Sequence, residues 1–484
     1  MMKRLFAQGQ WGLIALLALG TTVAITPRAS AAAGYSSVIL ADKPLGYWRL
    51  GESDPGQPAK DASGNGNDGT YAGGITLGQA GAISRDSDTA AAFDGSTGYV
   101  DIPSSAGGTF DLANSFSLEA WVINKGQFGS GQAGRIFSNR QPGYGLGIVH
   151  TGGTTDAVRF TTFGVKDYDS NATIVPEDGN WHHLVVVFDS NNTATFYLDG
   201  NFTDAIGGPG PANSSGSHLW IGSNPVSPEY FNGSIDEAAI YNYELTASQV
   251  KAHFQAGAPY PAVVVSDTPL GYWRLGESDP SQPAKDASGN GNDGIYNGGI
   301  TLGQTGAING DPNTAALFDG SSGYVDIPSG GAGGTFDLLS SFSLEAWVIN
   351  AGQFGSGQAG RILSNRQPGY GFGIIHAGGT TDAMRFTTFA VKDYDSNATI
   401  VPEDGNWHHV VVVFDSSYTA TFYLDGRFTE AIPGPGPAHS SASDLWIGSN
   451  PASPEWFNGS IDEAAVYSYE LTAAQVQAHF QAGQ

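Results

Sequence analysis

The chain has 484 residues, of which 69 are glycine, 11% are aromatic and none is cysteine, and its formal net charge is −26 at pH 7. Nucleic acids and anionic membranes are bound by clustered Lys and Arg, so this charge argues against both as partners. Without disulfides, stability has to come from a buried core, with help from a metal as a further source. The length leaves room for two or three domains.

Residues 1–31 have the pattern of a signal peptide. Lys3 and Arg4 give a positive start, Trp11–Ile25 is mostly apolar, and Ala29-Ser30-Ala31 is a small-residue cleavage site. No later apolar run reaches the ~18 residues that a membrane-spanning helix needs. We therefore expect a secreted, extracellular protein with no membrane insertion.

The rest of the chain is an internal repeat. Trp48 returns as Trp273, and Trp181 returns as Trp407. Repeats of this length are whole domains, which we place at residues 34–257 and 260–484. The few residues between them include Pro259 and Pro261, so we expect a restricted relative orientation of the two domains.

Short strands separated by turn residues fill each repeat. Ala91–Phe93 and Tyr99–Ile102 are expected to form a hairpin around Asp94-Gly95. In the first repeat the predicted strands are Pro44–Glu52, Ala91–Phe93, Tyr99–Ile102, Phe116–Ile123, Arg135–Ser138, Gly145–His150, Val158–Phe163, Leu184–Phe188, Ala194–Asp199, His218–Gly222 and Ser234–Tyr241.

Asn180–Gly200 predicts a central hairpin. Leu184–Phe188 is apolar without interruption, as in a strand buried on both faces, and Asp189–Asn192 is a polar turn. Since neighbouring side chains of a strand point to opposite faces, His182 and His183 cannot share one metal ion.

Only the end of each repeat predicts a helix. Thr246 and Gln249 form a capping-box pattern, and Gly257 is placed to end the helix. The prediction is an all-β protein of two tandem antiparallel β-sandwich domains, each ending in a short α-helix. The first and last long strands both have buried patterns, so we expect them to pair in one sheet.

The ordered set of motifs resembles a known family. YWRLGE at 47–52, DASGNGNDG at 61–69, FSLEAWV at 116–122, ATFYLDG at 194–200 and SIDEAAIY at 234–241 all have counterparts in the second repeat. Together they resemble the laminin G-like jellyroll domain of the concanavalin A-like lectin/glucanase superfamily, over nearly all of both repeats. The resemblance implies a jellyroll sandwich, often calcium-bearing, that binds carbohydrate or protein outside the cell. It names no ligand.

The Asp/Asn/Gly loop after the first strand has the hard oxygen donors that calcium prefers. If the terminal strands pair, a carboxylate of the last strand could complete the ion's ligands. The alternative is a polar turn in which Asp and Asn cap their own backbone. The predicted ligands of a structural calcium ion are Asp61, Asn67 and Asp236 in the first domain, and Asp286, Asn292 and Asp462 in the second.

Two repeated segments, Gly126–Gly134 and Lys166–Ala172, combine aromatic and polar side chains in the way that sugar-binding loops do. The alternative is that these aromatic residues pin long loops to the sandwich. The predicted ligand-binding residues are Phe128, Tyr144, Tyr168 and Asp169, with Phe354, Tyr370, Tyr394 and Asp395 as their counterparts.

No catalytic residues are predicted. The superfamily's glucanases carry E-x-D-x-x-E on a strand, whereas this chain has Glu52, Asp54 and then Gln57, with a proline between. We expect an exported, non-catalytic protein with two equivalent lectin-like modules and an extracellular glycan or cell-surface protein as partner. An adhesion or spacer protein is the alternative, and a polysaccharide-degrading enzyme is less favoured.

Overall fold

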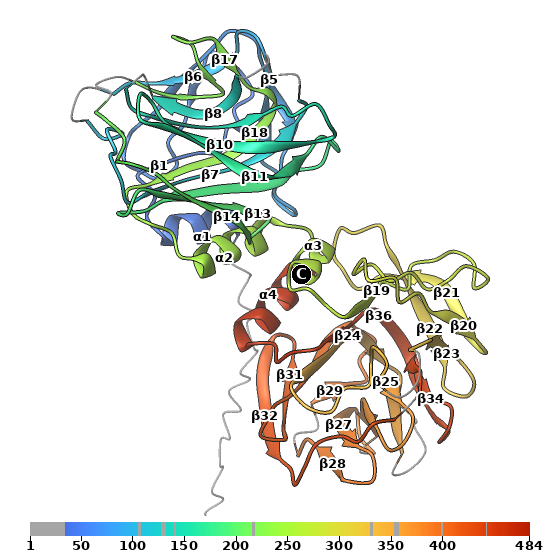
Figure 1. The fold of residues 1–484 in the computed structure, drawn as a ribbon. Coiled ribbons are helices and arrows are strands. Elements are labelled where there is room, and N and C mark those ends of the chain that lie inside the picture. The colour runs from blue at the N-terminus through green and yellow to red at the C-terminus, as the bar shows by residue number, and fades with distance from the viewer. Residues whose placement is uncertain are drawn as a thin grey trace, which may run out of the picture. The chain divides into compact units, whose positions relative to one another are not determined.

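The computed structural model (Figure 1) describes residues 34–104, 108–126, 132–139, 142–214, 218–329, 333–352, 358–376, 378–397, 400–441 and 443–484. They form two β-sandwiches in tandem, one from each repeat. Among these residues no helix is long and apolar enough to cross a membrane.

The first sheet of domain 1 is antiparallel, and its central strands carry the longest apolar runs. In spatial order its strands are β14 (Asn201–Gly207), β13 (Thr193–Leu198), β12 (His182–Phe188), β7 (Phe116–Asn124), β18 (Asn232–Tyr241), β5 (Thr89–Asp94) and β4 (Ile75–Ala80), with β1 (Gly46–Trp48) beside β18. Trp48 pairs with Ala238 and Gly46 with Ile240, which confirms the predicted pairing of the first and last strands.

The second sheet packs against the first. In order its strands are β11 (Lys166–Pro176), β10 (Thr155–Thr162), β9 (Tyr144–Val149), β8 (Ala133–Asn139), β15 (Leu219–Ile221), β6 (Tyr99–Ile102), β3 (Gly69–Ala72) and β2 (Pro58–Ala59), with β16 (Ser223–Asn224) and β17 (Glu229–Tyr230) at its side. Its pairings are antiparallel, except that β17 runs parallel to β8.

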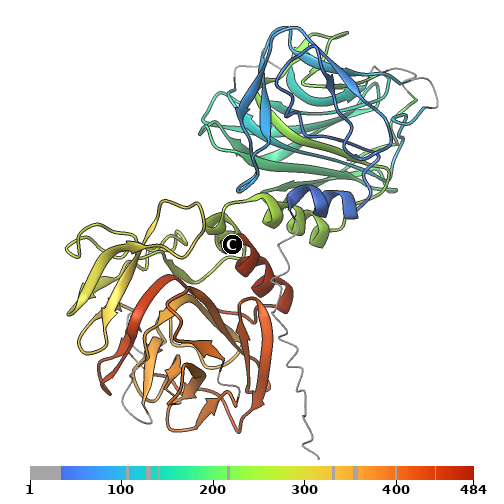
Figure 2. The same ribbon diagram turned by 180° about the vertical axis from the view of Figure 1, so that it is seen from behind.

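Strand β12 is buried on both faces, as its apolar run predicts. Leu184 and Val186 point into the core between the two sheets. Val185 and Val187 point the other way, into an apolar layer beneath the helices. The helices that cover this layer are α1 (Tyr35–Ala41) and α2 (Ala247–Gly257), which lie side by side in both views (Figures 1 and 2).

Domain 2 repeats this arrangement. Its elements are α3 (Tyr260–Ser266), β19 (Gly271–Trp273), β20 (Ile295–Asn297), β21 (Ile300–Thr305), β22 (Thr314–Asp319), β23 (Tyr324–Ile327), β24 (Phe342–Asn350), β25 (Ala359–Asn365), β26 (Tyr370–Ile375), β27 (Thr381–Thr388), β28 (Lys392–Asp395), β29 (Val401–Pro402), β30 (His408–Phe414), β31 (Thr419–Leu424), β32 (Arg427–Pro433), β33 (Leu445–Ile447), β34 (Ser449–Asn450), β35 (Glu455–Trp456), β36 (Asn458–Tyr467) and α4 (Ala473–Gly483). The all-β class, with two tandem antiparallel sandwiches that each end in a short helix, is confirmed.

Each domain also begins with a helix, and the expectation that only its end is helical is wrong. The seven residues of α1 place Tyr35 and Ile39 in the apolar layer against α2. The predicted capping box at the start of α2 is confirmed, since Thr246 and Gln249 make both of its hydrogen bonds.

The predicted hairpin of Ala91–Phe93 with Tyr99–Ile102 is also wrong, because β5 and β6 belong to different sheets. The Asp94 carboxylate accepts hydrogen bonds from the backbone N–H groups of Ser96, Thr97 and Gly98. This turn carries the chain from one sheet to the other instead of folding it back on itself.

Candidate functional site

A polar cleft of about 630 Å³ opens on domain 1 where β4, β7, β18 and the start of β12 meet. Trp181 gives it one large aromatic surface, and amide, ammonium and carboxylate groups surround the ring. The polar residues that line it are Gln79, Asn124, Lys125, Glu177, Asn180 and Ser234.

The turn before β12 positions Trp181. Gly179 has φ +80°, which a side chain would strain, and the Asp178 carboxylate accepts from the backbone N–H and the side-chain amide of Asn180. After the tryptophan, His182 lies between two carboxylates, with Nδ1 2.8 Å from Asp199 and Nε2 3.3 Å from Asp178. The residues before and after Trp181 are therefore fixed by hydrogen bonds, and its indole is partly exposed.

Two carboxylates and an imidazole meet at the wall of the cleft. His150, Asp156 and Glu177 place one ligand atom each within 4.8 Å of one another, and Glu177 also lines the cleft. Asn124 connects the cleft with this cluster, because it lines the cleft and its Nδ2 donates to Asp156 Oδ2 at 2.8 Å. No sequence pattern linked these residues, which come from three separate strand ends.

Domain 2 has the same residues at the matching places. Gln304, Asn350, Glu403, Asn406 and Trp407 stand where domain 1 has Gln79, Asn124, Glu177, Asn180 and Trp181. Ala351 replaces Lys125, so the domains differ by one charge here. His376, Asp382 and Glu403 form the second three-residue cluster.

A second polar depression lies on the face of the other sheet, in domain 2. It has a volume of about 490 Å³ and is lined by Arg361, Arg385, Thr387, Asp393 and Glu455, among others. Nε and Nη2 of Arg361 donate to the Glu455 carboxylate, and its guanidinium lies 5.1 Å from the centre of the Phe389 ring. These donors and acceptors mostly satisfy one another.

The predicted binding residues Asp169 and Asp395 lie on this sheet face. Each carboxylate receives two hydrogen bonds from one guanidinium, that of Arg159 for Asp169 and that of Arg385 for Asp395. Their segment is strand and not loop: in β11, Asp167 and Asp169 are exposed while Tyr168 and Ser170 are buried.

The four predicted tyrosine platforms are buried, and their assignment as stacking surfaces is wrong. Tyr144, Tyr168, Tyr370 and Tyr394 have no exposed surface. The Tyr168 ring packs on Phe160 and Phe188 in the core, so the alternative, in which these aromatic residues pin surface segments to the sandwich, describes them. Phe128 and Phe354 lie outside the described residues.

The carboxylate of Asp61 organises its own loop. Oδ1 accepts from the backbone N–H groups of Tyr47 and Ser63, and Oδ2 accepts from the backbone and side chain of Asn67. The side chain of Asn67 also donates to Leu45 O. Asp286 and Asn292 repeat this pattern. These contacts are those of the polar turn, and calcium binding by this loop stays a prediction.

Asp236 makes separate contacts. Its carboxylate accepts from Ala82 N at 2.8 Å and from Glu237 N at 2.9 Å, and Asp462 does the same with Ala307 and Glu463. Burial and the neighbouring Glu237 raise the pKa of Asp236 well above its usual value. The pairs Asp236–Glu237 and Asp462–Glu463 are buried at a bulge of the last strand, and calcium binding by Asp236 and Asp462 stays a prediction.

The fold defines a class: tandem antiparallel sandwiches of the lectin type, with a polar cleft on domain 1 and the matching residues in domain 2. A family model described as the concanavalin A-like lectin/glucanases superfamily matches residues 94–251 and 319–477, and the chain belongs to this family. No curated relative matches the chain.

The chain is similar to several solved structures. Domain 4 of AbnA, an extracellular arabinanase from Geobacillus stearothermophilus in complex with arabinotriose, is 20% identical with TM-score 0.33, over 45% of this chain and 98% of that one. Domains LG4-5 of the mouse laminin α1 chain are 12% identical with TM-score 0.23, over 75% of this chain and 86% of that one. A pentraxin from Limulus polyphemus is 14% identical with TM-score 0.23, over 29% and 71%.

Proposed function

We propose that this is an exported, non-catalytic binding protein whose two domains each bind glycan in the cleft at Trp181 or Trp407. The proposal rests on one observation: a partly exposed indole that lines a polar cleft with amide and carboxylate groups in domain 1, with the same residue types at the matching positions of domain 2. Sugar rings offer an apolar face for stacking and hydroxyl groups that both donate and accept hydrogen bonds. Such ligands suit pockets with an aromatic wall and a few convergent polar groups.

The chemistry of the cleft supports an uncharged or weakly charged polymer as ligand. Lys125 and Glu177 give domain 1 one cation and one anion at the cleft, whereas domain 2 has Glu403 with Ala351. A strongly anionic glycan would meet the net charge of −26 without a shared cationic group at both sites. Neutral polysaccharides are therefore the first ligands to test.

A glycan array with the whole chain tests the proposal, followed by titration of each hit. Trp181→Ala/Trp407→Ala should weaken binding by at least about tenfold, which corresponds to 1.4 kcal/mol. Phe202→Ala/Phe428→Ala is a matched control, because these aromatic residues are 61% and 62% exposed on edge strands β14 and β32, away from the cleft. Unchanged binding by the tryptophan variant would contradict the proposed site.

Exposed Phe202 and Phe428 support a second candidate, an adhesion or spacer protein that contacts other proteins. If the array gives no glycan ligand and the Phe202→Ala/Phe428→Ala variant loses attachment to a protein-coated surface, this candidate is preferred. Turnover of soluble polysaccharide by the whole chain would instead show an enzyme.

A further inference from the structure

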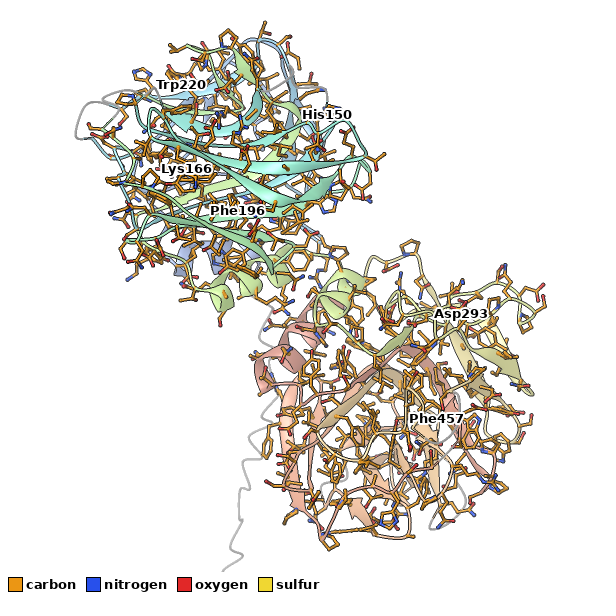
Figure 3. The ribbon with its side chains drawn as sticks, in the orientation of Figure 1. His150, Lys166, Phe196, Trp220, Asp293 and Phe457 are labelled. Atoms are coloured by element: carbon orange, nitrogen blue, oxygen red, sulfur yellow. The ribbon has the colours of Figure 1, made fainter. Side chains whose placement is uncertain are left out.

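Each domain has one imidazole nitrogen that faces two carboxylates at once. His150 follows β9, Asp156 lies in β10 and Glu177 follows β11 (His150 is labelled in Figure 3). Nδ1 of His150 lies 3.0 Å from Asp156 Oδ1 and 2.9 Å from Glu177 Oε1. One nitrogen can carry one proton, so it cannot donate along both directions. The three atoms converge as ligands of a shared cation do.

His182 shows the contrasting arrangement in the same domain. Its two carboxylate neighbours lie at different nitrogens, Asp199 at Nδ1 and Asp178 at Nε2, as in an ordinary hydrogen-bonded bridge. Two acids that flank a histidine in this protein can therefore lie at its two different ring nitrogens, and they do not have to meet at the same one. In the described part of the chain, convergence is seen at His150 and at its counterpart His376, whose Nδ1 lies 3.0 Å from both Asp382 Oδ1 and Glu403 Oε1.

An unsatisfied oxygen points into each cluster. Oε1 of Glu177 is buried, and within the described part of the chain it accepts no hydrogen bond, although His150 Nδ1, which also faces Asp156, lies 2.9 Å away; Glu403 Oε1 and His376 Nδ1 repeat this at 3.0 Å. A buried oxygen without a donor is costly unless something else neutralises it. The Glu177 carboxylate fits here because residue 126 is a glycine: a Cβ at that position would lie 2.3 Å from Glu177 Oε1.

The neighbouring groups hold the buried carboxylate in place. Asp156 has no exposed surface, and its Oδ2 accepts from Asn124 Nδ2 at 2.8 Å. The Asn124 Oδ1 accepts from Gly126 N, which fixes the amide's orientation. Asn350, Asp382 and Gly352 repeat these contacts. Such outer hydrogen bonds orient metal ligands in proteins.

We propose that each cluster is a zinc site, with His150, Asp156 and Glu177 as ligands in domain 1 and His376, Asp382 and Glu403 in domain 2. Calcium takes oxygen ligands, whereas one imidazole and two carboxylates suit zinc and neutralise its two charges. Ligand atoms around tetrahedral zinc lie about 3.3 Å apart. The His150 nitrogen and the two carboxylate oxygens would therefore have to move apart by only a few tenths of an ångström to admit the ion. The inference is independent of glycan binding.

Zinc titration of the chelator-treated whole chain, followed by calorimetry, tests the assignment. We expect two ions per chain, one after His150→Ala, and none after His150→Ala/His376→Ala. Asn124→Ala should weaken one site by about 10- to 100-fold, because it frees the Asp156 carboxylate. Cobalt, as a spectroscopic substitute, should give the absorption of a low-symmetry site, and millimolar calcium should not displace zinc.

His218→Ala is the matched control: Nδ1 of His218 lies 2.7 Å from Asp101 in a partly exposed pair, and zinc uptake should stay at two. Thermal melts check that each variant folds, and if the histidine variants do not, Glu177→Gln/Glu403→Gln decides, since it keeps the side-chain size. No zinc uptake by the natural chain, displacement by calcium, or undiminished uptake by the double variants would overturn the assignment.

Discussion

His253 on α2 and Glu119 on β7 form a buried ion pair: Nδ1 of His253 lies 2.9 Å from Glu119 Oε2, and neither side chain is exposed. The other nitrogen of His253 lies 2.9 Å from Asp42 Oδ2, so each ring nitrogen faces an acid and the imidazolium form is favoured. His183 Nε2 also lies 2.8 Å from Glu119 Oε1. This network fastens the terminal helix to the sheet, and His479, Glu345 and Asp267 repeat it.

The network predicts that stability falls as pH rises above neutral. Burial alone would lower the pKa of His253, but Glu119 and Asp42 raise it from 6.5 to about 9, and His479 behaves alike. A raised histidine pKa gives stability that is complete below pH 6.5 and is lost as pH approaches 9. The loss is on the order of 3 kcal/mol per domain at most. Urea unfolding between pH 7 and 9 measures it.

Two kinds of buried carboxylate titrate outside the interval from pH 7 to 9. Burial raises the pKa of Glu237 and Glu463 to about 7 despite Arg49 and Arg274, so their contribution is lost between pH 4.5 and 7. His253 and His183 hold the pKa of Glu119 low against the effect of burial, and that contribution is lost only in acid. His218→Gln, on the surface, should keep the slope between pH 7 and 9. A flat profile there would contradict the ion pairs.

His253→Ala should destabilise the protein by about 3–5 kcal/mol, because it leaves the buried Glu119 carboxylate short of its main counter-charge. The loss should be smaller at acid pH, because without the His253 charge the burial of Glu119 raises its pKa and favours uptake of a proton in the variant. Chemical unfolding at pH 5 and pH 7 compares the two conditions, with His218→Ala as the surface control. Equal loss at both pH values would mean that packing, and not charge, carries the effect.

Asp61→Ala should destabilise domain 1 by about 1–3 kcal/mol, because backbone N–H groups of Tyr47, Ser63 and Asn67 lose their acceptor. If hydrogen bonds alone close the loop, the loss is the same in chelator and in millimolar calcium. A calcium ion saturated at ~100 times its dissociation constant would add about 2.7 kcal/mol to the natural chain. A loss seen only with calcium would support the calcium site predicted from the sequence.

The sequence predicts the sandwich well because its information is local and periodic. The apolar run of β12 and the pairing of Trp48 with Ala238 follow from residue patterns that a strand makes visible. Tyr168 was misassigned because aromatic and acidic residues in one segment look like a binding loop. Strand alternation instead sends Asp169 outward and Tyr168 inward.

The clefts and clusters were missed for a different reason. His150, Asp156 and Glu177 come together only because β9, β10 and β11 are neighbours, a relation that no spacing in the chain encodes. Trp181 did have a signal: it precedes the central hairpin in both repeats, at the polar start of a strand, although its ring also packs against the apolar layer beneath the helices. Predicting the site required the order of the strands.

The matching candidate sites of the two domains predict avidity for polymeric glycan. Trp181→Ala and Trp407→Ala, made singly, leave one intact cleft in an otherwise complete chain. If both sites engage one polymer, each single variant should bind immobilised polysaccharide at least about tenfold more weakly than the natural chain, while affinity for a short oligosaccharide at the remaining site stays unchanged. Only Ala258 and Pro259 separate α2 from α3, so few conformations are lost on double engagement.

Surface plasmon resonance at low and high polysaccharide density separates binding by one site from binding by both, because avidity grows with density. Equal affinity of the single variants and the natural chain at every density would show that the two clefts act independently.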